Sequence, residues 1–376
     1  MIDLKRCIKC TLPETHETIT FSNEGLCSVC QNAGLKKEVD WDERNLILRK
    51  LLEKNRDIDA DYDCIIPFSG GKDSTFTLYY VVKELKLKPL VVSFDHGFYR
   101  PNLIANREKV LTKLGVDFLL FRPNWLLVKE LMLKSFLDKG DFCWHCHTGI
   151  ASYPHWVAVE KNIPLLIWGE SSSEYTNYFD VNDFHSIDEV SYNRISNLGI
   201  SGEDMYYRLK GEFQKRDFKP FTFPPLDSLK KIGYKSFPLG NYIKWDTRKQ
   251  VEIIKKELGW QGDQVEGVPP QYDYEKIECA MQGVRDYIKY IKRGYARTTH
   301  LTSIDIRNDS GLDRETAMKL ISEFEGKRPA SLDKFLEYVG LSEIDFLEIA
   351  QGHNVDPWDG KVFLQTPQIR AQNLQE

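Results

Sequence analysis

The sequence predicts an α/β protein with a parallel sheet covered by helices on both faces, and three observations support this. Short apolar runs alternate with helix-like stretches over residues 62–168, the order expected of parallel strands joined by helical crossovers. A glycine turn at residues 69–74 joins the first run directly to a helix. Polar residues follow three of the runs, and parallel strands bring such carboxyl ends to one edge. We therefore expect a ligand site at that edge.

The apolar and amphipathic patterns give each element a range. Strands are expected at 62–68, 89–94, 118–122 and 164–168. Helices are expected at 41–55, 74–85, 102–114, 125–137 and 150–161, and then at 248–258, 274–292, 313–324, 331–339 and 342–350. Residues 179–246 are rich in Tyr, Asn, Pro and Gly, so they are expected to be irregular and to form a substrate or partner contact.

These patterns suggest three regions. Residues 1–45 are a turn-rich segment with too few apolar residues for a core of its own. Residues 46–245 hold the sheet, with an insertion at 179–245, and residues 246–376 are mostly helical.

The composition is that of a soluble globular protein, with 41% apolar and 28% charged residues among 376. No apolar run reaches the roughly 20 residues that span a bilayer, and the first residues lack an apolar signal core. We therefore expect a cytoplasmic protein without a membrane partner. The net charge of −5 does not favour attraction to a polyanion, so a nucleic-acid partner is not expected.

The glycine turn reads Ser69-Gly-Gly-Lys-Asp-Ser74. At a helix N-terminus, unpaired amides and the helix dipole favour an anion, and phosphate is its natural ligand. Gly70 and Gly71 allow close approach, Ser69 and Ser74 offer hydroxyls, and Lys72 offers a cation. Asp73 is a candidate Mg²⁺ ligand. The structural alternative is an ordinary glycine-rich turn with a capping serine.

Two other strand ends are expected to complete the site. Phe94 and Asp95 end the second run, where sheets of this kind hold ribose and adenine, although Asp95 could instead cap a turn. Gly169 and Glu170 end the fourth run, and a close backbone approach beside a carboxylate suits contact with a metal or substrate. A purely structural role for that pair stays open.

The first cysteines are spaced as a metal site. Cys7-x-x-Cys10 and Cys27-x-x-Cys30 present two thiolates from each of two turns, as in a tetrathiolate zinc knuckle. The alternative is a pair of disulfides, which a reducing cytoplasm disfavours. A structural zinc ion would also explain how so short a segment folds.

A further Cys-x-x-Cys pair, Cys143 and Cys146, has no second pair nearby, but the distant Cys279 could complete a site. His145 and His147 are alternative partners. Three interpretations stay open: a second metal or iron–sulfur site, a redox or sulfur-carrying pair, or buried thiols that only pack.

Several segments together resemble a known family. They are the N-terminal CIKCTLPETHETITFSNEGLCSVC, then IIPFSGGKDST, VVSFDHGF, CWHCHTGI and LLIWGESSSEY, and finally YDYEKIECAMQGVRDYIKYIKRGYAR. Over nearly its whole length the chain resembles the N-acetyl sugar amidotransferases, a family of PP-loop enzymes (N-type ATP pyrophosphatases) that act in surface-polysaccharide and nonulosonate synthesis. The resemblance implies an adenine nucleotide alpha hydrolase-like fold.

The resemblance also implies a function. The expected reaction converts a sugar acetamido group to an acetamidino group, through an adenylated intermediate and with release of AMP and pyrophosphate. The expected substrate is UDP-2,3-diacetamido-2,3-dideoxy-mannuronate, used in lipopolysaccharide O-antigen synthesis, and the cofactors are ATP, Mg²⁺ and Zn²⁺. Ammonia would come from a partner glutaminase resembling the histidine-pathway synthase pair. Residues implied in nucleotide binding are Phe68, Ser69, Gly70, Gly71, Lys72, Asp73, Ser74, Phe94, Asp95 and Gly169, and those implied in catalysis are Lys72, Asp73 and Glu170.

Two other functions stay open. A tRNA thiolase of the same PP-loop group would also adenylate an oxygen, and three cysteines suit sulfur handling, but no RNA-binding module is recognisable. A zinc-knuckle scaffold that only senses nucleotide would bind ATP without releasing pyrophosphate.

Overall fold

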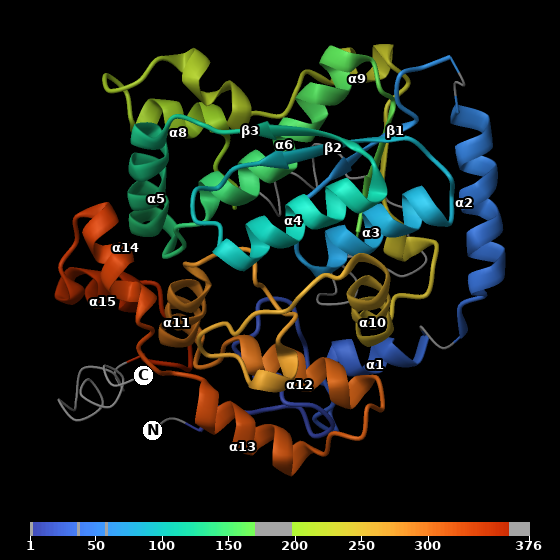
Figure 1. Cartoon of the computed structure of the whole chain (residues 1–376). Coiled ribbons are helices and arrows are strands. Elements are labelled where there is room, and N and C mark those ends of the chain that lie inside the picture. Colours follow the sequence, from blue (N-terminus) through green and yellow to red (C-terminus); the bar gives the residue numbers. More distant parts are fainter. Residues whose placement is uncertain (1–2, 36–37, 57–58, 170–197, 361–376) are drawn as a thin grey trace.

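Five parallel strands form one sheet in the order β3-β2-β1-β4-β5 (Figure 1). The computed structural model describes residues 3–35, 38–56, 59–169 and 198–360. The strands are β1 (Cys64–Pro67), β2 (Pro89–Phe94), β3 (Asp117–Phe121), β4 (Leu165–Trp168) and β5 (Lys235–Pro238). This order confirms the predicted fold class, with β1 at the centre of the sheet.

Successive residues of β1 face opposite layers, as the pleat of a strand requires. Cys64 and Ile66 pack in the main core cluster, whereas Ile65 packs on the other face. The first face is covered by α2 (Trp41–Asn55), α3 (Lys72–Lys83), α4 (Pro101–Leu114) and α10 (Thr247–Leu258). The second face is covered by α6 (Trp144–Lys161). Burial on both faces explains why β1, β2 and β4 are mostly apolar, whereas the edge strand β3 is partly exposed.

The four predicted strands are present, but the fifth was missed. Residues 235–238 lie in the stretch that was expected to be irregular, and they pair with β4 at the edge of the sheet. That expectation is also wrong for α8 (Gly202–Arg208), the 3₁₀ helix η4 (Lys215–Phe221) and α9 (Leu226–Lys231). These elements are short and are buried by tertiary contacts, since Phe218 and Phe221 pack against α5 (Trp125–Lys139) and α6.

The C-terminal region adds a second helical layer. It contains α11 (Gln282–Arg293), α12 (Arg297–Arg307), α13 (Arg314–Phe324), α14 (Ser331–Val339) and α15 (Glu343–Gln351). Helix α12 was not predicted. The helix expected from residue 274 begins only at Gln282, because residues 274–281 form turns in which Lys276 has a φ of +51°. In Figure 1 these helices lie below the sheet, on the side of α3 and α10.

The N-terminal segment packs on this helical layer. Thr15 Oγ1 donates to the carbonyl of Arg293 at 2.5 Å, and Thr11 Oγ1 donates to the carbonyl of Thr299 at 3.0 Å. Arg314 Nε donates to the carbonyl of Cys10 at 3.2 Å. The first residues of the chain are therefore held by its last helices. Within the described residues, none of the helices combines the length and the apolar character needed to cross a bilayer.

Candidate nucleotide site

The glycine turn lies between β1 and α3, at the carboxyl edge of the sheet. Gly70 has a φ of +86°, which favours glycine, and the following Gly71 is the N-cap of α3. As a glycine, the N-cap residue has no side chain with which to cap this helix. The amides of its first turn therefore lack the partners that a capping residue supplies, as an anion site requires.

Hydroxyl groups and an indole hold the turn in shape. Ser74 Oγ accepts from the amide of Gly70 at 3.1 Å and lies 3.1 Å from Ser69 Oγ. The amide of Gly71 donates to Ser69 Oγ at 3.3 Å. Trp260 Nε1, from the segment after α10, donates to the carbonyl of Gly70 at 3.0 Å. The preceding Phe68 is buried, and its amide donates to Val92 of β2.

Lys72 is buried beside two carboxylates. Its Nζ lies 2.7 Å from Asp73 Oδ2 and 3.0 Å from Glu275 Oε2. Glu275 is only 1% exposed. Burial alone would raise its pKa, but the cations Lys72, Lys276 and Arg297 outweigh burial and lower the pKa to about 2. Glu275 is therefore ionised and pairs with the loop lysine.

The other carboxylate oxygen of Asp73, Oδ1, is buried and makes no hydrogen bond within the described part of the chain. A buried oxygen without a partner is costly unless a ligand binds it. A carboxylate oxygen beside a phosphate-binding turn is a typical Mg²⁺ ligand. Asp73 therefore fits the expected role of holding Mg²⁺.

Glu278 lies against the glycine turn itself. A Cβ added to Gly71 would be 1.9 Å from Glu278 Oε1, and Ser69 Oγ donates to the same oxygen at 3.4 Å. The Glu278 carboxylate thus lies at the place where the turn is suited to bind a phosphate. A side chain at position 71 would collide with this carboxylate unless Glu278 moved.

The end of β4 meets the start of α3, as expected. A Cβ on Gly169 would lie 2.9 Å from Thr77 Oγ1 and 3.4 Å from the carbonyl oxygen of Asp73. The carbonyl of Gly169 accepts from the amide of Gly240 at 3.0 Å. Glu170, the predicted acid or base, lies outside the described residues.

The end of β2 holds Phe94 and Asp95, both buried. The Phe94 ring packs among other aromatic rings, while its carbonyl accepts from the hydroxyl of Tyr99. Asp95 Oδ1 accepts from the amide of Gly97 at 2.9 Å, and Oδ2 lies 2.7 Å from Arg122 Nε. Asp95 therefore caps a turn in this structure, which is the alternative that the sequence left open.

The four N-terminal cysteines form one cluster. Cys7, Cys10, Cys27 and Cys30 are buried, and their sulfur atoms all lie within 4.8 Å of one another. The Sγ atoms of Cys10 and Cys27 are 3.7 Å apart, and those of Cys7 and Cys30 are 3.9 Å apart. Zinc–thiolate bonds of about 2.3 Å in a tetrahedron require such spacings. The cluster fits a zinc knuckle.

The other three predicted ligands line one small cavity. Cys143, Cys146 and Cys279 border it, together with Arg285, and its volume is about 60 Å³. Cys143 and Cys146 lie at the start of α6, which begins at Trp144 rather than at the expected residue 150. Cys279 follows Glu278, so the cavity adjoins the glycine turn through one residue. Burial raises the pKa of the Cys279 thiol to about 11.

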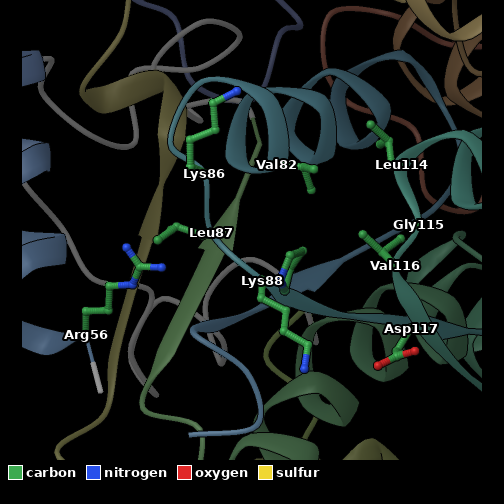
Figure 2. A pocket seen from close by; sticks show the side chains of 10 residues that line it. Arg56, Val82, Lys86, Leu87, Lys88, Leu114, Gly115, Val116 and Asp117 are labelled. Carbon is green, nitrogen blue, oxygen red and sulfur yellow. The ribbon is translucent and has the colours of Figure 1, made fainter. Parts of the chain in front are cut away.

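A larger cavity, of about 320 Å³, lies at the opposite edge of the sheet. Figure 2 shows Arg56, Lys86, Lys88 and Asp117 around it, with aliphatic side chains between them. It lies beside the ends of α3 and α4, where cations complement the helix dipoles. This cavity is therefore separate from the nucleotide site.

Sequence reasoning missed Glu275, Glu278 and Trp260 at the glycine turn. All three come from beyond residue 245 and reach the turn only through the tertiary fold. The one available signal was the acidic spacing in Glu275-Lys-Ile-Glu278, directly before Cys279. That spacing lies within the helix that the sequence predicts at 274–292.

Comparison with known proteins gives a match to the C-terminal part of the chain that contacts the glycine turn. Residues 266–360 match the family described as LPS biosynthesis protein WbpG-like, C-terminal domain. We call residues 266–360 the WbpG-like domain. The matched range includes Glu275 and Glu278, so this domain supplies both carboxylates at the glycine turn. The match to a lipopolysaccharide family supports the resemblance to enzymes of surface-polysaccharide synthesis.

Two further likenesses are more distant. An uncharacterized protein of Methanocaldococcus jannaschii, MJ1599, is 25% identical over 131 residues, which cover 34% of this chain and 47% of that protein. The chain thus spans about half of the length of this curated relative. A solved structure, the U34-tRNA thiolase NcsA from Methanococcus maripaludis with its [4Fe-4S] cluster, is 15% identical. The two chains are each covered to 91%, with a TM-score of 0.34.

Proposed function

We propose that the chain is an ATP-dependent, AMP-forming N-acetyl sugar amidotransferase. The observation that carries this proposal is the uncapped glycine turn at the carboxyl edge of the sheet, with Lys72 and Asp73 beside it and a WbpG-like domain closing over it. The proposed substrate is UDP-2,3-diacetamido-2,3-dideoxy-mannuronate, in lipopolysaccharide O-antigen synthesis in the cytoplasm. The WbpG-like match to a lipopolysaccharide family supports this choice.

The chemistry proceeds in two displacements. An amide oxygen is a poor leaving group, so it first attacks the α-phosphorus of ATP, and the bond to the β-phosphate oxygen breaks to release pyrophosphate. Ammonia then adds to the carbon of the adenylated amide. The C–O bond breaks, AMP leaves with the former amide oxygen, and loss of a proton gives the acetamidino group. The barrier falls where charge on the leaving phosphates is stabilised.

The residues of the turn suit the first displacement. The amides of α3 and the ammonium of Lys72 would bind the β- and γ-phosphates, and Mg²⁺ on Asp73 would neutralise charge on the leaving pyrophosphate. Phe94 and Asp95 would border the nucleoside, with Asp95 holding the turn at 95–97. Glu170 is proposed to take the proton that the nitrogen loses after ammonia has added to the adenylated amide.

Ammonia requires a source outside the described site. We propose a separate glutaminase, resembling the histidine-pathway synthase pair, as the partner. The zinc knuckle packs against the helical C-terminal layer rather than against the sheet, so it stabilises the WbpG-like domain, which closes the site.

We further propose that Cys143, Cys146 and Cys279 hold an iron–sulfur cluster. Among described residues, the N-terminal cysteines are the group of three or more ligands whose donor atoms lie mutually within 4.8 Å. The three thiols are therefore too widely spaced to share a single zinc ion, but a cluster places several atoms between its ligands. Burial raises the pKa of all three thiols, which disfavours free reactive thiolates.

The same cavity favours a second candidate function, a tRNA thiolase. A cluster beside the glycine turn would suit sulfur transfer to an adenylated base. The net charge of −5 favours the sugar substrate instead. A gel shift with bulk tRNA distinguishes the two, because a thiolase must bind tRNA and the amidotransferase need not.

An isotope experiment tests the proposed function directly. The purified chain is incubated with ATP, Mg²⁺, ammonium and UDP-diacetamido sugars labelled with ¹⁸O in one acetamido group. We expect ¹⁸O in the AMP and a sugar product in which NH replaces the oxygen. Release of ADP, or AMP without the label when product forms, would contradict the mechanism. The label also identifies which acetamido group reacts.

A further inference from the structure

A chain of alternating charges leads from the glycine turn into the C-terminal domain. Asp73 and Glu275 flank Lys72 at 2.7 and 3.0 Å. Arg297, the first residue of α12, lies 3.5 Å from Glu275 Oε1 and 3.5 Å from Asp286 Oδ1. All five groups lie in the interior or are mostly covered, so each charge depends on its neighbours for compensation.

Glu275 and Asp73 both pair with the ammonium of Lys72, so the two carboxylates share this cation. One ammonium lies near Oδ2 of Asp73 on one side and Oε2 of Glu275 on the other. Asp73 Oδ1 meanwhile makes no hydrogen bond among the described residues. Without the negative charge on Glu275, the pairing of the Lys72 ammonium with Asp73 would lose its competitor on the Glu275 side. The lysine would then compete with a cation for Asp73.

We propose that Glu275 is a positioning residue of the ATP site, which shares Lys72 with Asp73 and so keeps Asp73 available to the divalent cation that accompanies ATP. This inference rests on the proposed function, because it assumes that the turn binds ATP with Mg²⁺. It also makes the C-terminal domain, through Arg297 and Asp286, part of the nucleotide site. Glu275 does not itself touch the reacting atoms.

The inference predicts two opposite shifts in the variant Glu275→Gln. Removing a negative charge beside Lys72 leaves the turn more positive, so ATP without Mg²⁺ should bind more tightly. The stronger pairing of Lys72 with Asp73 should raise the Mg²⁺ concentration for half-maximal pyrophosphate release by about tenfold, a typical effect of one nearby charge. A residue that only supported the fold would weaken both properties together.

The experiment measures ATP binding by calorimetry, with and without Mg²⁺, and the Mg²⁺ dependence of pyrophosphate release, using the full chain. Glu325→Gln is the matched control, because Glu325 is a buried carboxylate of the same domain that accepts from Thr299 and contacts none of the turn residues named here. Melting temperatures are recorded for both variants. If Glu275→Gln does not fold, Glu275→Gln/Arg297→Gln removes both charges of the pair and should still raise the Mg²⁺ requirement. An unchanged requirement in that double variant would overturn the inference.

The outcomes separate the two proposals. If the wild-type chain binds no ATP at any Mg²⁺ concentration, the proposed function and this inference both fail. If the wild type binds ATP but Glu275→Gln shows an unchanged Mg²⁺ dependence, or a parallel loss of both properties, the inference alone is overturned. Opposite shifts in Glu275→Gln, with none in Glu325→Gln, support it.

Discussion

Glu278 sets a carboxylate oxygen so close to Gly71 that a Cβ at position 71 would lie 1.9 Å away. The two residues are far apart in sequence, and they belong to the glycine turn and the WbpG-like domain respectively. The contact means that a side chain at position 71 would displace the Glu278 carboxylate from the glycine turn.

Gly71→Ala should cost about 1 kcal/mol of unfolding free energy, at the low end of the usual effect of overpacking, because the Cβ displaces only the flexible Glu278 side chain. Glu278→Ala should recover most of that cost in the double variant. Urea unfolding of the wild type, both single variants and the double variant measures this coupling. ATP binding should stay weak in the double variant, since alanine still hinders close approach of phosphate. If the unfolding free-energy costs of the two single variants simply added up in the double variant, the contact between positions 71 and 278 would be contradicted.

Asp73→Asn should lower pyrophosphate release by about a hundredfold or more, as for loss of one key group that stabilises transition-state charge. The amide keeps the size of the side chain, so the melting temperature should change little. Asp227→Asn is the control, because Asp227 is 88% exposed and lies on α9. Turnover retained in Asp73→Asn would remove the proposed Mg²⁺ role.

Cys27→Ser should abolish bound zinc and lower the melting temperature. Loss of the ion would also loosen the contact of Arg314 with the backbone of the knuckle. Metal content by mass spectrometry and thermal unfolding check this. Cys64→Ser is the control, because Cys64 is a fully buried thiol of β1 outside the cluster, and it should keep its zinc even if stability falls. Unchanged zinc in Cys27→Ser would exclude the tetrathiolate site.

Cys279→Ser should prevent iron incorporation when the chain is reconstituted without oxygen, and should leave zinc in place. Iron content and the visible charge-transfer absorption of thiolate-bound iron are the measurements. Cys27→Ser provides the reciprocal control, since it should lose zinc and keep iron. A wild-type chain that takes up no iron would overturn the cluster and leave a redox or sulfur-carrying pair, or packed thiols.

Acid should destabilise the protein through buried histidines. Burial lowers the pKa of His155 from 6.5 to about 4, so the unfolded state binds its proton first as pH falls. The contribution of neutral His155 to the free energy of unfolding is fully present above about pH 6.5. It is lost as the pH falls from 6.5 to 4, by up to about 3 kcal/mol.

The variant His155→Phe tests this slope. The side chain lies near the rings of Trp168, Phe223 and Tyr234, so phenylalanine suits the site. We expect the unfolding free energy of the variant, measured from pH 8 to pH 5, to rise relative to that of the wild type as the pH falls. A constant difference would mean that His155 does not titrate in this way.

The sheet could be predicted because its strands are encoded locally. Strands β1, β2 and β4 are mostly apolar runs buried on both faces, and β3 is an apolar run at the edge of the sheet. Helices α3, α4 and α5 follow β1, β2 and β3. Strand β5 escaped prediction because its four residues follow a turn at Gly233 and end at Pro238, and only pairing with β4 makes them a strand.

The candidate site also has one part that could be predicted from the sequence and one part that could not. The glycine turn and its lysine could be read from six consecutive residues. Glu275 and Glu278 could not, because their role depends on contacts across about half of the chain. The turn containing Lys276, with its positive φ, replaced the expected helix and brought both carboxylates to Lys72 and Gly71.

The docking of the N-terminal knuckle on the last helices also sets an order of events during synthesis. Thr15 bonds to Arg293, 278 residues later. At about 5–20 residues per second, a ribosome needs roughly 15–60 s to make that partner. The cysteine segment at 7–30 is therefore made well before its docking partner, and metal capture by its four thiols is a stabilising step open to it in the interval. Zinc supply during translation would then govern the yield of folded protein.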